Sequence, residues 1–134
     1  ALIVLFVVSA IMGVDKSHSL ISIKPEVLIR IGGNVPIRVF DGQVYRLITA
    51  TFLNANLLHL LSNIVGVLMI FSRLEACYSI LELIVLYLIS GVSGNILSDL
   101  TSSSPNKVTV GTSIVLIGFV GALIAYLIIN WSTL

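Results

Sequence analysis

Long apolar segments alternate with short polar ones along this chain, and four of the apolar segments approach the length that crosses a membrane. The hydrocarbon core of a bilayer needs roughly 20 predominantly apolar residues in a helix, which satisfies its own backbone hydrogen bonds. The pattern therefore predicts an all-α fold, a polytopic transmembrane helical bundle that forms a single domain over residues 1–134. The expected spanning segments are 1–14, 53–72, 79–98 and 111–130.

Two polar segments separate these expected helices. Residues 15–52 carry most of the charge and are too polar to span, yet their many apolar side chains are unlike those of a solvated linker. An interfacial loop with short amphipathic helices, interrupted at Gly32-Gly33-Asn34, fits this mixture best. Residues 99–110 contain serine, proline, asparagine and lysine close together, which is typical of a loop in water.

The composition supports a membrane environment. The chain is 57% hydrophobic and 10% charged, with a mean hydropathy of +1.14, whereas soluble domains have roughly 25% charged residues. We expect an integral, multi-pass membrane protein with the lipid bilayer as a partner. A net charge of +1 gives no broad basic surface for phosphates, so nucleic acid is not an expected partner. The lone Cys77 forms no internal disulfide, and no Cys or His spacing predicts a metal site.

Polar side chains inside the apolar segments are the places where function is expected. An unpaired polar group in hydrocarbon costs on the order of several kcal/mol, so such residues rarely occur without a role. His59 and Asn63 are four positions apart in the second segment and therefore project from one helix face, where both present N–H donors. The alternative is that they only hydrogen-bond a neighbouring helix for structure.

Ser113 falls near the start of the fourth segment. Backbone N–H groups there are unsatisfied and lie at the positive end of the helix dipole, which suits a nucleophile whose attack creates an oxyanion. Gly111 leaves room for an approaching substrate backbone. The alternative is that Thr112 or Ser113 is a helix cap and that the glycines of this helix serve close packing.

Five short motifs, taken together and in this order, resemble the rhomboid family of intramembrane serine proteases over roughly residues 40–126. No single motif is specific for the family, but the occurrence of all five in the family's order and spacing is specific. The motifs are Tyr45-Arg46 within a loop, His59 and Asn63 as His-xxx-Asn, Arg73-Leu74-Glu75, Gly91 to Asn95 as Gly-xx-Gly-Asn, and Gly111-Thr112-Ser113 as Gly-x-Ser.

The resemblance implies a role for each matching residue. Ser113 corresponds to the nucleophile, and its backbone N–H with the His59 and Asn63 side chains corresponds to the oxyanion hole. Tyr45 and Arg46 correspond to the pair that anchors the large loop. The glycines expected at close-packed positions are Gly91, Gly94, Gly111, Gly118 and Gly121.

The implied activity is that of an intramembrane serine endopeptidase, which cleaves transmembrane substrates by acyl transfer and needs no cofactor. The family's general base is a histidine on its sixth helix, and neither His18 nor His59 fits that place. With four of the six core helices visible, we expect further helices beyond Leu134. Three residues also depart from the family pattern, namely Asn54, Ile114 and Ile117.

Two other classes of function stay open. One is a catalytically inactive rhomboid-like protein that binds transmembrane clients or is a subunit of a membrane complex. The other is a channel or transporter subunit, which needs pore-lining charges or paired broken helices. Glu82 is the one candidate carboxylate at membrane depth for that third class, and the preferred interpretation is an interfacial residue that faces the lipid headgroups. The oligomeric state is not predicted.

Overall fold

The structure is a computed structural model that describes residues 1–15 and 21–131. This part of the chain is mainly helical, which confirms the predicted all-α class, with one short antiparallel strand pair that the sequence analysis did not expect. In chain order the elements are α1 (Leu2–Met12), β1 (Val14–Asp15), β2 (Ser22–Ile23), α2 (Pro25–Arg30), α3 (Pro36–Phe40), α4 (Arg46–Thr49), the 3₁₀ helix η1 (Ala50–Phe52), α5 (Leu57–Leu74), α6 (Ile80–Thr101) and α7 (Ser113–Ile129).

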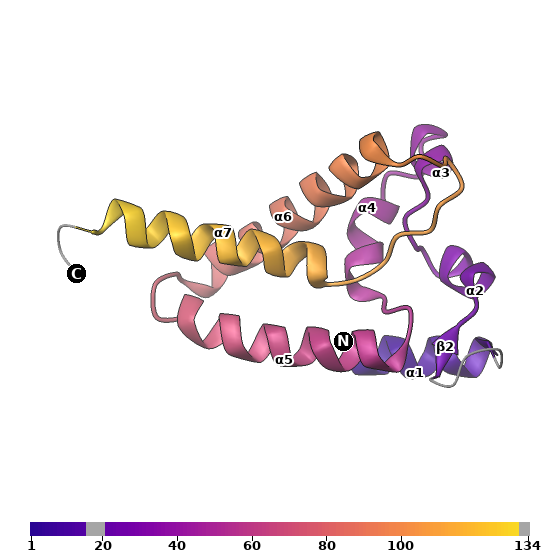
Figure 1. The fold of residues 1–134 in the computed structure, drawn as a ribbon, viewed down its shortest axis with the longest axis horizontal. Helices are drawn as coiled ribbons and strands as arrows, with labels where there is room; N and C mark the ends of the chain where they lie inside the picture. Colours follow the sequence, from indigo (N-terminus) through magenta and orange to yellow (C-terminus); the bar gives the residue numbers. More distant parts are fainter. Residues whose placement is uncertain (16–20, 132–134) are drawn as a thin grey trace.

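The three long helices α5, α6 and α7 form the body of the fold. In Figure 1, α5 and α6 diverge from their short connection, and α7 lies between them. α7 packs against both neighbours, and its buried Val115 and Phe119 meet Leu74 of α5 and Leu83 of α6 in one apolar core. The start of α7 is thereby held close to the start of α5.

Two of these helices are long and apolar enough to cross a membrane. They are α5, with 18 residues, and α6, with 22, and only 17% of each apolar stretch is buried inside the protein. Apolar helices that leave most of their side chains outward match a hydrocarbon solvent better than water. α1 and α7 are also apolar but shorter, with 11 and 17 residues.

The helix limits differ from the expected spans by a few residues, for local reasons. The second span begins at Leu57 instead of 53, because residues 50–52 form η1 and Asn56 caps α5. The third reaches Thr101, past the expected loop boundary at 99. The fourth begins at Ser113, because Gly111 has a φ of +134°, which no helix accommodates.

The segment before α5 contains the short helices expected there. α2 and α3 each begin with a proline, which fits the first helical turn because its missing N–H has no partner to lose. This segment packs on α1 and the start of α5 through a second apolar core, made by Phe6, Ile23, Leu28 and Leu60. His18, which the sequence analysis considered as a general base, lies outside the described residues.

Glu82 has a structural role at the start of α6. Its carboxylate accepts hydrogen bonds from the Ser79 backbone N–H at 2.7 Å and from the Ser79 hydroxyl at 2.9 Å, and the Ser79 oxygen accepts from the Glu82 N–H. These contacts form a capping box, in which serine and glutamate satisfy each other's unpaired helix-end donors. The carboxylate is thus used for helix initiation, and a channel role has no support here.

Candidate functional site

The sequence-predicted site residues meet where η1, the start of α5 and the start of α7 come together. The segment that leads into α7 is fastened to η1 by two hydrogen bonds. The Gly111 N–H donates to the Ala50 carbonyl at 3.0 Å, and the buried Thr112 hydroxyl donates to the Thr51 carbonyl at 2.8 Å. These bonds fix the backbone immediately before Ser113 relative to the chain that enters α5.

Ser113 and His59 both lie beside Gly111. A Cβ atom added to Gly111 would lie 2.7 Å from His59 Nε2 and 3.2 Å from the Ser113 Oγ. The imidazole and the hydroxyl therefore lie close together at Gly111, and the imidazole takes up the room that a side chain would need. Since Gly111 also has a positive φ of +134°, glycine is required at this position for both shape and backbone conformation.

The backbone turn that carries His59 is fixed by a helix cap. The Asn56 side chain accepts a hydrogen bond from the His59 N–H at 2.7 Å, so Asn56 is the N-cap of α5. Sequence analysis missed this residue, although asparagine just before an apolar helical segment is a recognised start signal. The cap places His59 in the first turn of α5, at the level of the α7 start.

Asn63 lies one turn after His59 and is buried, with 2% of its surface exposed. Its amide N–H₂ donates to the Asn54 side-chain oxygen at 2.7 Å. An asparagine amide has two N–H donors, so this contact orients the group and leaves one N–H for another acceptor. Asn54 is equally buried, and its own amide nitrogen has no partner.

Of the two residues considered as an alternative helix cap, Thr112 is the one at the N-cap of α7. Its side chain makes no capping bond because its hydroxyl is directed to the Thr51 carbonyl. Ser113 is the first residue of α7. The unpaired N–H groups of that first turn therefore keep the donor capacity that an oxyanion would need.

Arg46 lies at the centre of the loop that precedes α5. It is 3% exposed, and its guanidinium donates to the Ile29 carbonyl at 2.7 Å, the Gly33 carbonyl at 2.9 Å and the Gln43 side chain at 2.7 Å. A buried charge bonded to two separate loop carbonyls holds that loop in one shape. Tyr45 contributes less, because it is 53% exposed and only its ring lies under the guanidinium, 5.4 Å from ring centre to Cζ.

The expected close-packed glycines behave differently from one another. A Cβ at Gly91 would lie 2.7 Å from the Thr51 side chain, one at Gly94 would overlap Ile114, and one at Gly118 would overlap Ser90. These three glycines let α6 and α7 approach each other and η1. At Gly121 a Cβ would meet nothing within 4 Å, so the expectation of close packing there is wrong. That side of α7 has no neighbour in the described chain.

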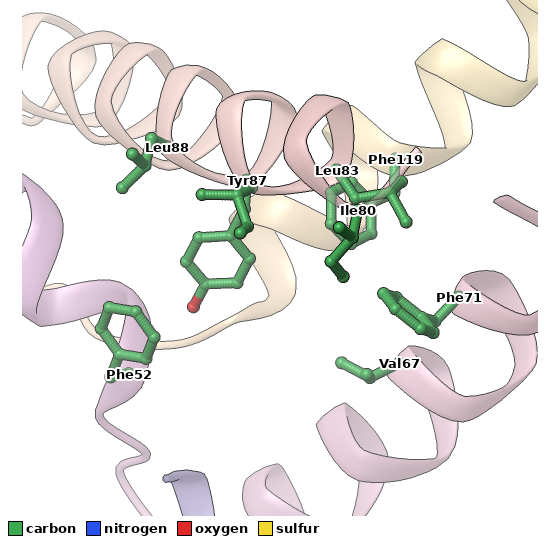
Figure 2. A pocket seen from close by; sticks show the side chains of 9 residues that line it. Phe52, Val67, Phe71, Ile80, Leu83, Tyr87, Leu88 and Phe119 are labelled. Carbon is green, nitrogen blue, oxygen red and sulfur yellow. The ribbon is translucent and has the colours of Figure 1, made fainter. Parts of the chain in front are cut away.

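An apolar pocket of about 340 Å³ lies apart from this polar cluster. Figure 2 shows its side chains from η1, α5, α6 and α7, among them Phe52, Phe71, Tyr87 and Phe119. The Phe52 and Tyr87 rings stack with centroids 5.1 Å apart. The Tyr87 hydroxyl lies 3.3 Å from the Thr51 carbonyl, where it links the pocket to the segment next to the site. Neither Ser113 nor His59 lines this pocket.

Within the described residues, no group of three or more His, Cys, Asp or Glu side chains is arranged to hold a metal ion. The site instead offers a hydroxyl, an imidazole and an amide near a helix N-terminus. In chemical terms this set suits a nucleophile with nearby hydrogen-bond donors.

Comparison with known proteins adds an independent finding. Residues 41–134 match the family model described as the Rhomboid domain. The chain is 38% identical over 94 residues to RHOMBOID-like protein 5 of Arabidopsis thaliana, an alignment that covers 70% of this chain and 30% of that protein. It is 40% identical over 95 residues to RHOMBOID-like protein 7 of the same plant, with 71% and 30% covered.

A further relative has protease in its name. The chain is 33% identical over 105 residues to Rhomboid-like protease 1 of Toxoplasma gondii, covering 78% of this chain and 36% of that protein. The chain thus spans about a third of the length of the curated relatives it matches. No solved structure gives a significant match. Because the family model covers most of the chain, including every motif on which the resemblance was based, the chain belongs to the membrane-embedded rhomboid family.

Proposed function

We propose that this chain carries the nucleophile and the oxyanion hole of an intramembrane serine endopeptidase. Ser113 Oγ attacks the carbonyl carbon of a peptide bond in a transmembrane substrate, and the peptide nitrogen leaves with a proton. Water then attacks the acyl-enzyme, which releases the second product and restores the hydroxyl. The name of the Toxoplasma relative, which includes the word protease, supports this class of reaction.

The observation that carries the proposal is the proximity of His59 and Ser113 beside Gly111. The position of a Cβ on Gly111 lies 2.5 Å from His59 Cε1, 2.7 Å from His59 Nε2 and 3.2 Å from Ser113 Oγ, so the two side chains lie close together beside Gly111. Donors to an oxyanion work at about 2.7–3.1 Å from the oxygen. A substrate carbonyl whose carbon approaches Ser113 beside Gly111 would bring its oxygen near the imidazole.

Three donors would stabilise the developing negative charge. They are the His59 imidazole N–H, the free N–H of the Asn63 amide, and the Ser113 backbone N–H at the start of α7. Removal of one such donor typically lowers the rate by about 10²–10³-fold. The Asn54 contact supports this assignment because it fixes the orientation of the Asn63 amide within a buried setting.

The membrane arrangement follows from the helices. α5 and α6 would span the bilayer, with α1 and α7 as further membrane segments, so that the protein is multi-pass. Substrates would be transmembrane helices whose backbone is opened near the site. The general base is assigned to a histidine other than His59, because the His59 imidazole is placed beside Gly111 as a donor to the carbonyl oxygen.

Cleavage of a reporter transmembrane helix by the full-length protein in lipid vesicles tests the proposal. Replacement Ser113→Ala should abolish cleavage, because Ser113 supplies the attacking oxygen and the neighbouring Thr112 hydroxyl is bonded to the Thr51 carbonyl. Ser93→Ala is the matched control, since that exposed hydroxyl bonds only to backbone carbonyls of its own helix. If Ser113→Ala cleaves like the unmodified protein, the protease assignment fails. An uncleaved reporter that still binds the unmodified protein would instead favour the inactive, client-binding alternative.

A further inference from the structure

A second buried polar cluster lies where the long loop, the end of α6 and the segment before α7 meet. Its centre is the side-chain pair of Asn34 and Asp99, in which the Asn34 amide donates to one Asp99 oxygen at 2.7 Å. Asn34 is fully buried and Asp99 is 8% exposed. These two residues are 65 positions apart in the chain, so their contact ties distant segments together.

The pair is also joined to the segment that leads to Ser113. The Asn34 backbone N–H donates to the Thr109 carbonyl at 3.0 Å, and the Thr109 N–H donates back to the Asn34 carbonyl at 2.9 Å. Two residues beyond Thr109 is Gly111, whose N–H is held by Ala50. The segment before Ser113 is therefore fixed at two points, and Asn34 supplies the first of them.

Two atoms of the Asn34–Asp99 pair have no hydrogen-bond partner among the described residues. The unpaired atoms are the Asn34 side-chain oxygen and the second Asp99 oxygen. Both accept hydrogen bonds when the carboxyl is ionised, so neither can satisfy the other. A protonated carboxyl has one O–H donor, and a single proton on Asp99 would supply the donor that the Asn34 oxygen lacks.

The charges around the pair do not favour an ionised carboxylate. Among the described residues, the side-chain hydrogen bond of Asp99 is the one with Asn34. The buried basic group of this loop, Arg46, has its guanidinium bonded to Gln43 and to the Ile29 and Gly33 carbonyls. Arg38 and Lys107 on the adjoining segments are exposed. A buried carboxylate without a cation is costly, whereas a neutral acid bonded at two points is not.

We propose that Asp99 holds a proton at neutral pH and forms a two-point carboxyl–amide pair with Asn34 that positions the segment leading to Ser113. The Asn34 amide donates to one Asp99 oxygen, and the other Asp99 oxygen donates its proton to the Asn34 carbonyl oxygen. The pairing itself is independent of the protease assignment, and only its effect on Ser113 rests on that proposed function.

Infrared spectroscopy of the full-length protein in lipid vesicles tests the proton directly. A protonated carboxyl has a C=O absorption separate from that of a carboxylate, and Asp99→Asn should remove one such band at neutral pH. Asp41→Asn is the matched control, because Asp41 is an exposed carboxyl in the same loop and its replacement should leave the band unchanged. If Asp99→Asn removes no protonated-carboxyl band, the proposal is overturned.

Thermal unfolding of the same samples gives a second test. Asparagine at 99 has the donor and acceptor of a protonated aspartate, so Asp99→Asn should unfold at the same temperature as the unmodified protein, and Asp99→Ala several degrees lower. Equal losses for Asp99→Asn and Asp99→Ala would show that a charged carboxylate is needed.

Reporter cleavage separates this inference from the proposed function. Asp99→Asn should keep the cleavage rate, and Asp99→Ala should lower kcat with little change in KM, because the segment before Ser113 loses a fixed point. If Asp99→Ala lowers the unfolding temperature but leaves kcat unchanged, the positioning role is wrong. Failure of Ser113→Ala to stop cleavage would remove the protease assignment and leave the infrared result to stand by itself.

Discussion

The two ends of the α5–α6–α7 body are held together by different forces. At the end near Ser113, buried polar atoms join η1, the loops and the helix starts through bonds of 2.7 to 3.0 Å, such as those of Asn63 and Gly111. At the apolar end, aromatic and aliphatic side chains of α5, α6 and α7 surround an open pocket of about 340 Å³. Figure 1 shows α5 and α6 closest at their short connection and farther apart at the first end, where α7 begins between them.

This difference indicates that the polar end fixes the positions of side chains and backbone segments, whereas the apolar end mainly holds the helices together. Hydrogen bonds in a low-dielectric setting are directional, and a buried polar atom without its partner is costly. Apolar contacts are non-directional and tolerate changes that conserve volume. We therefore expect substitutions at the polar end to have larger effects than substitutions of similar size at the apolar end.

Arg46→Ala should give the largest loss. It removes the donors to two loop carbonyls and to Gln43 from a residue that is 3% exposed. Since a hydrogen bond to a charged group contributes about 1.5–3 kcal/mol, we expect a loss of at least about 3 kcal/mol in unfolding free energy. Unfolding in detergent by denaturant measures this loss. The exposed Arg38→Ala is the control and should change stability by less than about 0.5 kcal/mol.

Gly111→Ala should give the second largest effect. The new methyl would meet the His59 ring and would require a residue with a side chain to adopt a φ of +134°. Backbone strain of this kind costs about 1–3 kcal/mol, and displacement of His59 should in addition stop cleavage. Gly42→Ala has the same kind of strain at a φ of +97° but nothing within 4 Å. Equal cleavage by the two variants would contradict the placement of His59 beside Gly111.

Tyr87→Phe probes the boundary between the two ends. It removes a hydroxyl that lies 3.3 Å from the Thr51 carbonyl but leaves the ring stacked on Phe52. Because the Thr51 carbonyl keeps its bond from Thr112, we expect a loss of about 0.5–1.5 kcal/mol. Thermal unfolding measures it. A loss as large as that of Arg46→Ala would mean that the apolar end also depends on directional bonds.

Gly121→Ala should have the smallest effect. No atom lies within 4 Å of the added methyl, and alanine is a better helix former than glycine by about 0.5–1 kcal/mol. We expect unchanged or slightly raised thermal stability. Gly118→Ala on the same helix is the contrast, because its methyl would overlap Ser90 and must separate α6 from α7. Similar unfolding temperatures for both variants would count against the close approach of these two helices.

Much of the candidate site was accessible from local sequence features. His59 and Asn63 were identified because polar side chains are rare in apolar helices, and Ser113 because of its place at a helix start after glycine. Helical periodicity, which is local, suffices for such inferences. The glycine at 121 was misjudged because close packing depends on what lies opposite, and nothing in a single helix pattern reports that.

The residues that fix the site could not be identified in this way. Asn34 and Asp99 are 65 positions apart, and Thr51 and Thr112 are 61 positions apart. Each of these pairs joins a loop to a segment far along the chain, and no periodicity links their members. Asn56 is the exception, since its cap is a local contact that a start signal could have revealed.

The sequence by itself determined the helical class and the apolar segments that form the long helices, because length, apolarity and the cost of unpaired polar groups act on each segment separately. Only the tertiary structure decided which polar atoms meet, which glycines are crowded and which carboxyl is buried. Those outcomes depend on the approach of segments far apart in the chain, and buried hydrogen bonds are sensitive to tenths of an ångström in that approach.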